Sequence, residues 1–186
     1  AQLYFQKPII NALSDISHPC QSISDIYTLF EHFGRNDNFN IVWMGDLNNV
    51  FFSLSEIIKF IPKTKIDVFT DKNIHINYQN IVNIPKNINF HYEIINEVLF
   101  SADCIMTDVY NSMNDKNDKE NVLIKFQVNE KVISETNANT VFMHCLPAKI
   151  GSEVTKEVIK GKKSIVIKQA KNRLISQKGI MKWLDI

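Results

Sequence analysis

The stretch TVFMHCLP, at residues 140–147, contains the pattern that most directly indicates the fold class. It begins with the apolar run VFM, of the kind that forms a strand buried on both faces of a parallel sheet. His144 and Cys145 follow this run, and a proline then ends the stretch. Open α/β sheets bind ligands outside the carboxyl ends of their strands. The stretch therefore favours a ligand site here, although a His–Cys pair taken alone more often belongs to a core.

Composition and charge limit the class of protein. The 186 residues are 45% hydrophobic and 22% charged, which is typical of a globular chain with one sizeable core. With 21 basic and 20 acidic residues the net charge is +1, so no nucleic-acid partner is expected. The sequence contains neither a bilayer-length apolar run nor a signal-peptide pattern, so we expect no membrane association. Three widely spaced cysteines fit reduced thiols in the cytoplasm better than a disulfide framework or a zinc site.

Apolar runs elsewhere alternate with patterns of helical period. Besides the strand in TVFMHCLP, strands are expected at residues 8–13, 40–45, 65–70, 88–92, 102–106 and 164–167. Helices are expected at residues 19–34, 50–61, 78–83, 122–129, 130–136, 154–159 and 169–184. This alternation predicts an α/β fold, a Rossmann-like three-layer sandwich with a central parallel sheet and helices on both faces. Only Gly45 is present where a dinucleotide fingerprint needs three glycines, so NAD or FAD binding is not expected.

The first expected helix carries two polar residues in its first turn, His18 and Gln21. Free backbone N–H groups and the helix dipole favour an anion at such a position. The alternative, that His18 merely caps the helix, is equally compatible with the local sequence.

Other polar residues follow expected strands or begin expected helices. Asn48 and Asn49 present amides after the second expected strand, although one of them can be a turn residue. Asp108 follows a later strand, and the polar residues 114–121 form either a solvated loop or a lid over a substrate. Arg173, near the start of the last helix, can meet an anion or form a surface ion pair.

Six short motifs occur in the order and with the spacing found in ornithine carbamoyltransferases. They are HPCQ at residues 18–21, GDLNNV at 45–50, TDVYNSM at 107–113, FQVNE at 126–130, HCLP at 144–147 and KNR at 171–173. The chain therefore resembles that family over nearly its whole length. Aspartate carbamoyltransferases are similar in fold but usually carry a different stretch in place of HCLP. The resemblance implies transfer of a carbamoyl group from carbamoyl phosphate to the δ-amine of L-ornithine, giving citrulline and phosphate in arginine biosynthesis, without a metal or organic cofactor.

The resemblance also implies roles for individual residues. Those implied to bind ornithine are Asn49, Asp108, Ser112 and Met113. Those implied to meet carbamoyl phosphate are His18, Gln21, Cys145, Leu146 and Arg173. The residues implied to be catalytic are His18, Asp108, Cys145 and Arg173. In this scheme His18 donates to the carbamoyl oxygen in the manner of an oxyanion hole. Cys145 is not expected to be a covalent nucleophile, because no residue is placed as its activating base.

Family members also have an N-terminal domain, with a Ser-Thr-Arg-Thr phosphate cradle and a further arginine, which residues 1–186 do not contain. We therefore expect the ornithine-binding half of the enzyme, inactive alone. Residues 1–33 would be a remnant of the carbamoyl-phosphate domain, comprising its last strand and a linking helix. Residues 34–167 would form the ornithine-binding domain, and residues 168–186 a helix that returns to the missing domain. The parent enzyme is expected to be a homotrimer.

Two departures from the family pattern concern substrate binding. Asn114 stands where the family usually has glycine, which bears on lid closure, and residues 148–150 replace a stretch that often carries further charges. Two other functions stay open, a stand-alone amino-acid-binding module without catalysis and a carbamoyltransferase for another amine. Asp108 and Ser112 argue against amines such as putrescine or an acylated ornithine, which lack a free α-amino group.

Overall fold

A parallel five-stranded sheet forms the centre of the molecule. The computed structural model describes residues 8–34, 37–79, 84–111 and 118–185. The strands lie in the order β3-β2-β1-β4-β5, and every neighbouring pair is parallel. They are β1 (Asn40–Met44), β2 (Lys65–Phe69), β3 (Ile88–His91), β4 (Cys104–Thr107) and β5 (Val141–His144). The predicted parallel α/β sheet is confirmed.

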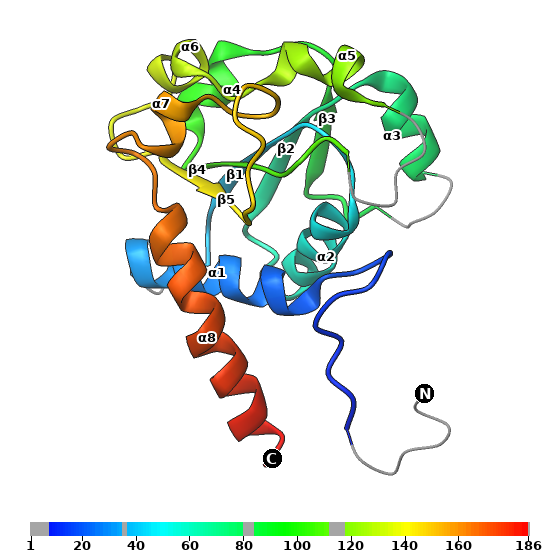
Figure 1. The fold of residues 1–186 in the computed structure, drawn as a ribbon, viewed down its shortest axis with the longest axis vertical. Helices are drawn as coiled ribbons and strands as arrows, with labels where there is room; N and C mark the ends of the chain where they lie inside the picture. Colours follow the sequence, from blue (N-terminus) through cyan, green and yellow to red (C-terminus); the bar gives the residue numbers. More distant parts are fainter. Residues whose placement is uncertain (1–7, 35–36, 80–83, 112–117, 186) are drawn as a thin grey trace.

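Helices cover both faces of this sheet (Figure 1). The α-helices are α1 (Pro19–Phe33), α2 (Asn49–Ile57), α3 (Lys72–Gln79), α4 (Asn96–Ser101), α5 (Glu120–Leu123), α6 (Glu130–Ser134), α7 (Lys156–Ile159) and α8 (Val166–Trp183). Two short 3₁₀ helices are η1 (Ile58–Phe60) and η2 (Ile124–Phe126). Among the described residues, no helix combines the length and the hydropathy that a membrane crossing requires.

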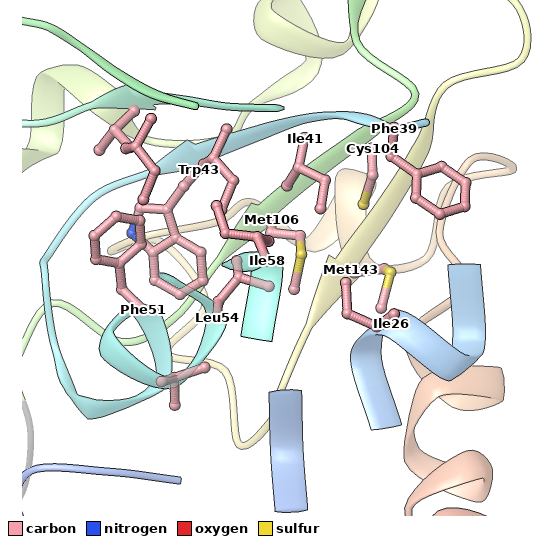
Figure 2. Packing of buried hydrophobic residues seen from close by; sticks show 14 of the residues in the cluster. Ile26, Phe39, Ile41, Trp43, Phe51, Leu54, Ile58, Cys104, Met106 and Met143 are labelled. Atoms are coloured by element: carbon pink, nitrogen blue, oxygen red, sulfur yellow. The ribbon is translucent and has the colours of Figure 1, made fainter. Parts of the chain in front are cut away.

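Side chains from the two faces of the sheet form two hydrophobic clusters. The first lies between the sheet and α1, α2 and η1, where Trp43 and Met106 of the strands meet Phe51 and Leu54 of α2 (Figure 2). The second lies under α4, α5, α6 and α7 and includes the strand residue Phe142. Each such fully buried side chain stabilises the fold by about 2 kcal/mol. Strands that are buried on both faces in this way have nearly continuous apolar sequences.

Residues 8–13 do not form the predicted strand. They have no regular secondary structure, and their side chains are exposed. A strand is stable only when its backbone groups pair with a neighbour, and no described strand lies beside this segment. Apolar character alone therefore gave a wrong prediction here.

The helix expected at residues 78–83 begins earlier, as α3. Asp71 starts it, because its carboxylate accepts a bond from the Asn73 N–H at 2.8 Å and its carbonyl accepts one from the His75 N–H at 3.0 Å. Tyr78 is buried against the sheet. Residues 80–83 lie outside the described part of the chain.

Two further boundaries differ from the prediction. The helix predicted at residues 122–129 is a short α5 followed by η2, after which Val128 pairs with Val154 in an isolated bridge. The strand predicted at residues 164–167 is a single bridge between Ser164 and Phe142, because α8 begins two residues later.

Candidate active site at the carboxyl edge of the sheet

The strand order places a switch point between β1 and β4. From β1 the chain proceeds to β2 and β3 on one side, and β4 and β5 lie on the other side. The connections that leave neighbouring strands in opposite directions open a crevice at their carboxyl ends, where α/β proteins bind ligands. Asn48 follows β1, Asp108 follows β4 and Cys145 follows β5, so the sheet brings these three side chains together.

Asp108 is the central group of this cluster. Its carboxylate is buried, and Oδ2 accepts a hydrogen bond from the Asn48 amide Nδ2 at 2.7 Å. Oδ1 accepts a bond from the Cys145 Sγ at 2.8 Å. Asn48 is itself fixed, because its Oδ1 caps α2 by accepting bonds from two backbone N–H groups. A carboxylate held on both oxygens at the switch point is well placed to bind a cationic group.

Asn49, which the family resemblance implies to bind ornithine, points elsewhere. Its Nδ2 donates to the Ser14 carbonyl at 2.7 Å and so holds the segment that precedes α1. Sequence reasoning singled out both asparagines but assigned a ligand only to the second. Capping geometry at the start of α2 is the signal that distinguishes them.

Cys145 is present as a thiol. Burial raises its pKa well above the ordinary value, and the negative charge of Asp108 and the hydrogen bond to it act in the same direction. A thiol that donates to a carboxylate is a poor nucleophile, because the thiolate is the reactive form. The geometry agrees with the expectation that Cys145 does not attack the substrate.

The ring of His144 is engaged within the protein on both of its nitrogens. Its Nδ1 accepts a bond from the Leu146 N–H at 2.9 Å, so its ring proton must lie on Nε2, which faces the buried Glu153 carboxylate at 3.1 Å. The same Glu153 oxygen accepts the Lys149 N–H at 2.6 Å. Glu153, which the sequence did not suggest, thereby holds both ends of the turn that carries Cys145. Leu146 in this turn has a φ of 56°, in the left-handed region.

A metal ion fits this cluster poorly. One donor atom each of Asp108, His144 and Cys145 lies within 4.8 Å of the others. However, His144 Nδ1 already accepts the Leu146 N–H, and a raised thiol pKa disfavours the thiolate that a metal requires. The three groups are engaged with the protein itself.

His18 and Gln21 lie at the start of α1. The backbone N–H of His18 donates to Ser53 Oγ at 2.6 Å, and the His18 ring makes no capping bond to the helix. Its Nδ1 is buried and has no partner among the described residues. Burial lowers the His18 pKa, and the positive charge of Arg173 lowers it further, so the ring is neutral at pH 7. His18 is thus the N-cap residue of α1, as the capping alternative predicted, but its ring makes no capping bond.

Gln21 is fully buried and meets a carboxylate that the sequence did not suggest. Its Nε2 donates to Asp25 Oδ1 at 2.7 Å, and Gln169 Nε2 of α8 donates to the same oxygen at 2.7 Å. Burial raises the pKa of Asp25 to about 7, although both of these bonds oppose the rise. Gln21 Oε1 is buried and has no partner among the described residues. The spacing of four residues between Gln21 and Asp25 is the only local signal of this pair.

Arg173 lies in the third turn of α8, which packs beside α1. Its charge adds to the effect of burial in lowering the pKa of His18, and it opposes the larger effect of burial that raises the pKa values of Cys20 and Cys145. Arg173 is thus within electrostatic reach of both the first turn of α1 and the turn after β5. His18 and Gln21 share the first turn of α1, and Arg173 lies within electrostatic reach of it.

Ser112 and Met113 lie outside the described residues, as does the first half of the expected lid, residues 114–117. The described residues on either side are held together. Asn111 Oδ1 accepts the Lys119 N–H at 2.9 Å, and Lys119 Nζ forms an ion pair of 2.9 Å with the buried Asp46 after β1. Gly45 lets this region approach closely, because a Cβ there would lie 2.8 Å from a Tyr110 ring carbon.

The fold and the site define an α/β ligand-binding domain whose crevice lies at the switch point of a parallel sheet. Residues 37–184 match the family model described as aspartate/ornithine carbamoyltransferase, Asp/Orn binding domain. The chain belongs to the aspartate/ornithine carbamoyltransferase family.

Individual relatives give the same assignment. The ornithine carbamoyltransferase of Aquifex aeolicus is 37% identical over 184 residues, covering 95% of this chain and 60% of that protein. The ornithine carbamoyltransferase of Methanocaldococcus jannaschii is 38% identical over 193 residues, covering 97% of this chain and 62% of that protein. The crystal structure of the Thermus thermophilus enzyme superposes with a TM-score of 0.83 at 32% identity, covering 98% of this chain and 61% of the other. The chain thus spans about 60% of the length of these relatives.

Proposed function

We propose that this chain is the ornithine-binding half of an ornithine carbamoyltransferase, a cytoplasmic enzyme of arginine biosynthesis. The reaction transfers the carbamoyl group of carbamoyl phosphate to the δ-amine of L-ornithine and yields citrulline and phosphate. The observation that carries the proposal is the buried Asp108 carboxylate at the switch point, bonded to Asn48 and Cys145. It lies in a chain whose residues 37–184 match the Asp/Orn binding domain.

Ornithine would be recognised through its amino-acid end. Asp108, with Ser112, would pair with the α-ammonium group, because a buried carboxylate binds a cation best when the cation completes its hydrogen bonds. Asn49 would exchange its bond to Ser14 for one to the α-carboxylate. Met113 would complete the pocket.

The δ-amine would lie beside the turn after β5. Its nitrogen must be neutral to attack the carbamoyl carbon, so the site has to favour loss of a proton from the ammonium form. Cys145, kept as a thiol by burial and by Asp108, adds no negative charge there that would favour the ammonium form, and it can exchange its hydrogen bond with the amine. The Leu146 carbonyl would accept the N–H that remains and would orient the lone pair.

The other end of the crevice would hold the carbamoyl group. A neutral His18 carries one ring N–H, which would exchange its bond to the Ala12 backbone for one to the carbamoyl oxygen, where negative charge develops during attack. Arg173 would stabilise that charge and meet the phosphate, and Gln21 would bind the carbamoyl amide. The bond that forms joins the δ-nitrogen to the carbamoyl carbon, and the bond that breaks is the one between that carbon and the phosphate oxygen. Phosphate leaves with the electron pair and takes up the proton that the δ-nitrogen loses.

A second domain would complete the enzyme. We propose that residues 1–33 and 168–186 pack against a phosphate-binding domain and that the chain is inactive without it. Apolar side chains exposed on these segments support this assignment, among them Leu13, Ile16, Leu174 and Trp183. Residues 34–167 would then form the ornithine-binding domain proper, and the complete enzyme would be a homotrimer.

The proposal is tested by supplying the remaining domain. The chain is combined with the N-terminal half of the Aquifex aeolicus relative, which gives what we call the assembled enzyme, and citrulline is measured. Citrulline formation from ornithine, none from the chain alone and none in Asp108→Ala supports the proposal. Putrescine and Nα-acetylornithine are run in parallel. Faster turnover of either one, or no turnover of any amine by the assembled enzyme, would contradict it.

A further inference from the structure

A buried chain of hydrogen bonds connects the end of β5 to the first turn of α1. It begins at the His144 backbone N–H, which donates to Gln169 Oε1 at 2.9 Å. Gln169 Nε2 donates to Asp25 Oδ1 at 2.7 Å, and the same oxygen accepts Gln21 Nε2 at 2.7 Å. All three side chains have 1% or less of their surface exposed, so water cannot substitute for these partners.

This chain of hydrogen bonds, which we call the relay, has a direction that its first donor fixes. A backbone N–H can only donate, so Gln169 must turn its oxygen toward His144 and its NH₂ toward Asp25. A carboxylate oxygen at position 25 accepts from both glutamines. Gln21 must therefore turn its NH₂ toward Asp25 and its Oε1 away from it. That oxygen is buried and has no partner among the described residues.

An unpartnered buried carbonyl oxygen requires a donor. A ligand group beside Gln21 must present an N–H, because a buried acceptor that faces a methyl group loses the hydrogen bonds it made to water. A carbamoyl group presents an NH₂ at the position where an acetyl group presents a methyl of nearly the same size. The orientation of one amide is thus sufficient to distinguish carbamoyl phosphate from acetyl phosphate.

We infer that Asp25 is the positioning residue that sets this selectivity, by holding the Gln21 amide with its oxygen toward the substrate. The inference rests on the proposed carbamoyl transfer and extends it to a residue outside the crevice. Asp25 touches no substrate and acts through Gln21. It also joins α1 to α8 and, through Gln169, to the strand that delivers Cys145.

The relay depends on Asp25 as a hydrogen-bond acceptor and not on its negative charge. Both bonds end on Oδ1, and Oδ2 has no partner among the described residues. The groups that face this carboxyl electrostatically are Arg173 on α8, Asp108 after β4, Cys104 on β4 and Cys145 after β5. An asparagine at position 25 can keep its Oδ1 in the same place. Gln169 compels it to do so, since the Gln169 oxygen stays on the His144 N–H.

The test compares three forms of the assembled enzyme, wild type, Asp25→Asn and Asp25→Leu. Each is assayed for the KM of carbamoyl phosphate, the KM of ornithine and the inhibition constant of acetyl phosphate. We expect the preference for carbamoyl over acetyl phosphate to fall at least ~10-fold in Asp25→Leu, since an amide free to rotate can turn its NH₂ outward. Asp25→Asn should keep this preference within ~3-fold, and the KM of ornithine should stay within ~3-fold in both variants.

A further variant covers the case in which Asp25→Leu does not fold. In Asp25→Asn with Gln169→Leu the anchor on His144 is gone, so the asparagine introduced at position 25 can turn its own NH₂ toward Gln21 and reverse that amide. This double variant should lose the preference that the single Asp25→Asn keeps.

The outcomes separate the inference from the proposed function. No citrulline from the wild-type assembled enzyme refutes the carbamoyl transfer itself. An active wild type with an unchanged preference in Asp25→Leu and in the double variant overturns the role of Asp25. Loss of the preference in Asp25→Asn alone, or a parallel rise in the KM of ornithine, also overturns it, because either result points to charge or to general packing.

Discussion

The stability of this chain should depend on pH through Asp25, and Asp25→Asn should remove that dependence. The folded protein holds the carboxyl in a fully buried position, where its pKa rises to about 7 from an ordinary value of 3.8. The unfolded chain exposes the same group to water and ionises it at the lower pH. Between these two values the unfolded state releases a proton that the folded state keeps. Folding is therefore favoured below the ordinary pKa and loses stability as the pH rises through the folded pKa.

The size of the effect follows from the two pKa values. A difference of about 3 corresponds to about 4 kcal/mol in the free energy of unfolding. About 1.5 kcal/mol of this is already lost at pH 5, so about 2.5 kcal/mol remains to be lost between pH 5 and pH 8. The substituted asparagine accepts the same two glutamine bonds but does not titrate. The stability of Asp25→Asn relative to wild type should rise by about 2.5 kcal/mol between these pH values.

Urea unfolding at pH 5, 6, 7 and 8, followed by circular dichroism, measures this difference directly. All other ionisable groups are common to both proteins, so their contributions cancel. Ser24→Ala, a buried neutral change on the same helix, is the matched control and should alter stability equally at every pH. A difference between Asp25→Asn and wild type that stays constant within about 0.5 kcal/mol would refute the reasoning, because the carboxyl would then ionise equally in both states.

Three other substitutions test the geometry of the site. Gly45→Ala should lower the free energy of unfolding by at least ~2 kcal/mol, because its φ is +123° and the new methyl would meet Tyr110; a melting temperature equal to wild type would contradict this. Glu153→Ala should lower the free energy of unfolding, measured in urea, by about 3 kcal/mol, since the buried His144 ring and the Lys149 N–H lose their acceptor. A loss under about 1 kcal/mol would show that the turn after β5 does not need Glu153 for its stability. Asp108→Asn should speed alkylation of Cys145 by iodoacetamide at pH 8 by ~10-fold, because burial remains but the charge that raises the thiol pKa is gone; an unchanged rate would mean that Asp108 does not control the thiol.

The parallel sheet was predictable because its strands are buried on both faces. In β1, Val42, Trp43 and Met44 form an apolar run that no exposed strand would show. The polar residues that follow such runs, Asp108 and Cys145, were found for the same reason. Their position after the run places them at the carboxyl edge, whatever the order of the strands.

Boundaries that depend on tertiary pairing were not predictable. Residues 8–13 and 164–167 have strand-like composition, but a strand exists only where a neighbour accepts its backbone bonds. The first segment has no such neighbour among the described strands, and the second makes one bridge to Phe142 before α8 begins. The local sequence does not contain this information.

The polar face of α1 was missed for a related reason. The spacing of Ile23, Ile26 and Phe30 predicts a single apolar face, yet Ile23 is partly exposed while Gln21 and Asp25 are buried. Their burial comes from α8, whose Gln169 lies 144 residues further along the chain than Asp25. Buried polar pairs that form between distant helices leave only weak traces in the sequence of either helix. The roles of Ser112 and Met113 remain predictions, because both lie outside the described residues.

Binding of L-ornithine to this chain, measured by calorimetry, tests the central claim most directly. The experiment uses the chain alone and the assembled enzyme, each as wild type and as Asp108→Ala, and carbamoyl phosphate is titrated separately. The account predicts saturable ornithine binding that weakens at least ~30-fold in Asp108→Ala, with little affinity of the isolated chain for carbamoyl phosphate. Equal ornithine affinity in wild type and Asp108→Ala, or no ornithine binding even in the assembled enzyme, would contradict it.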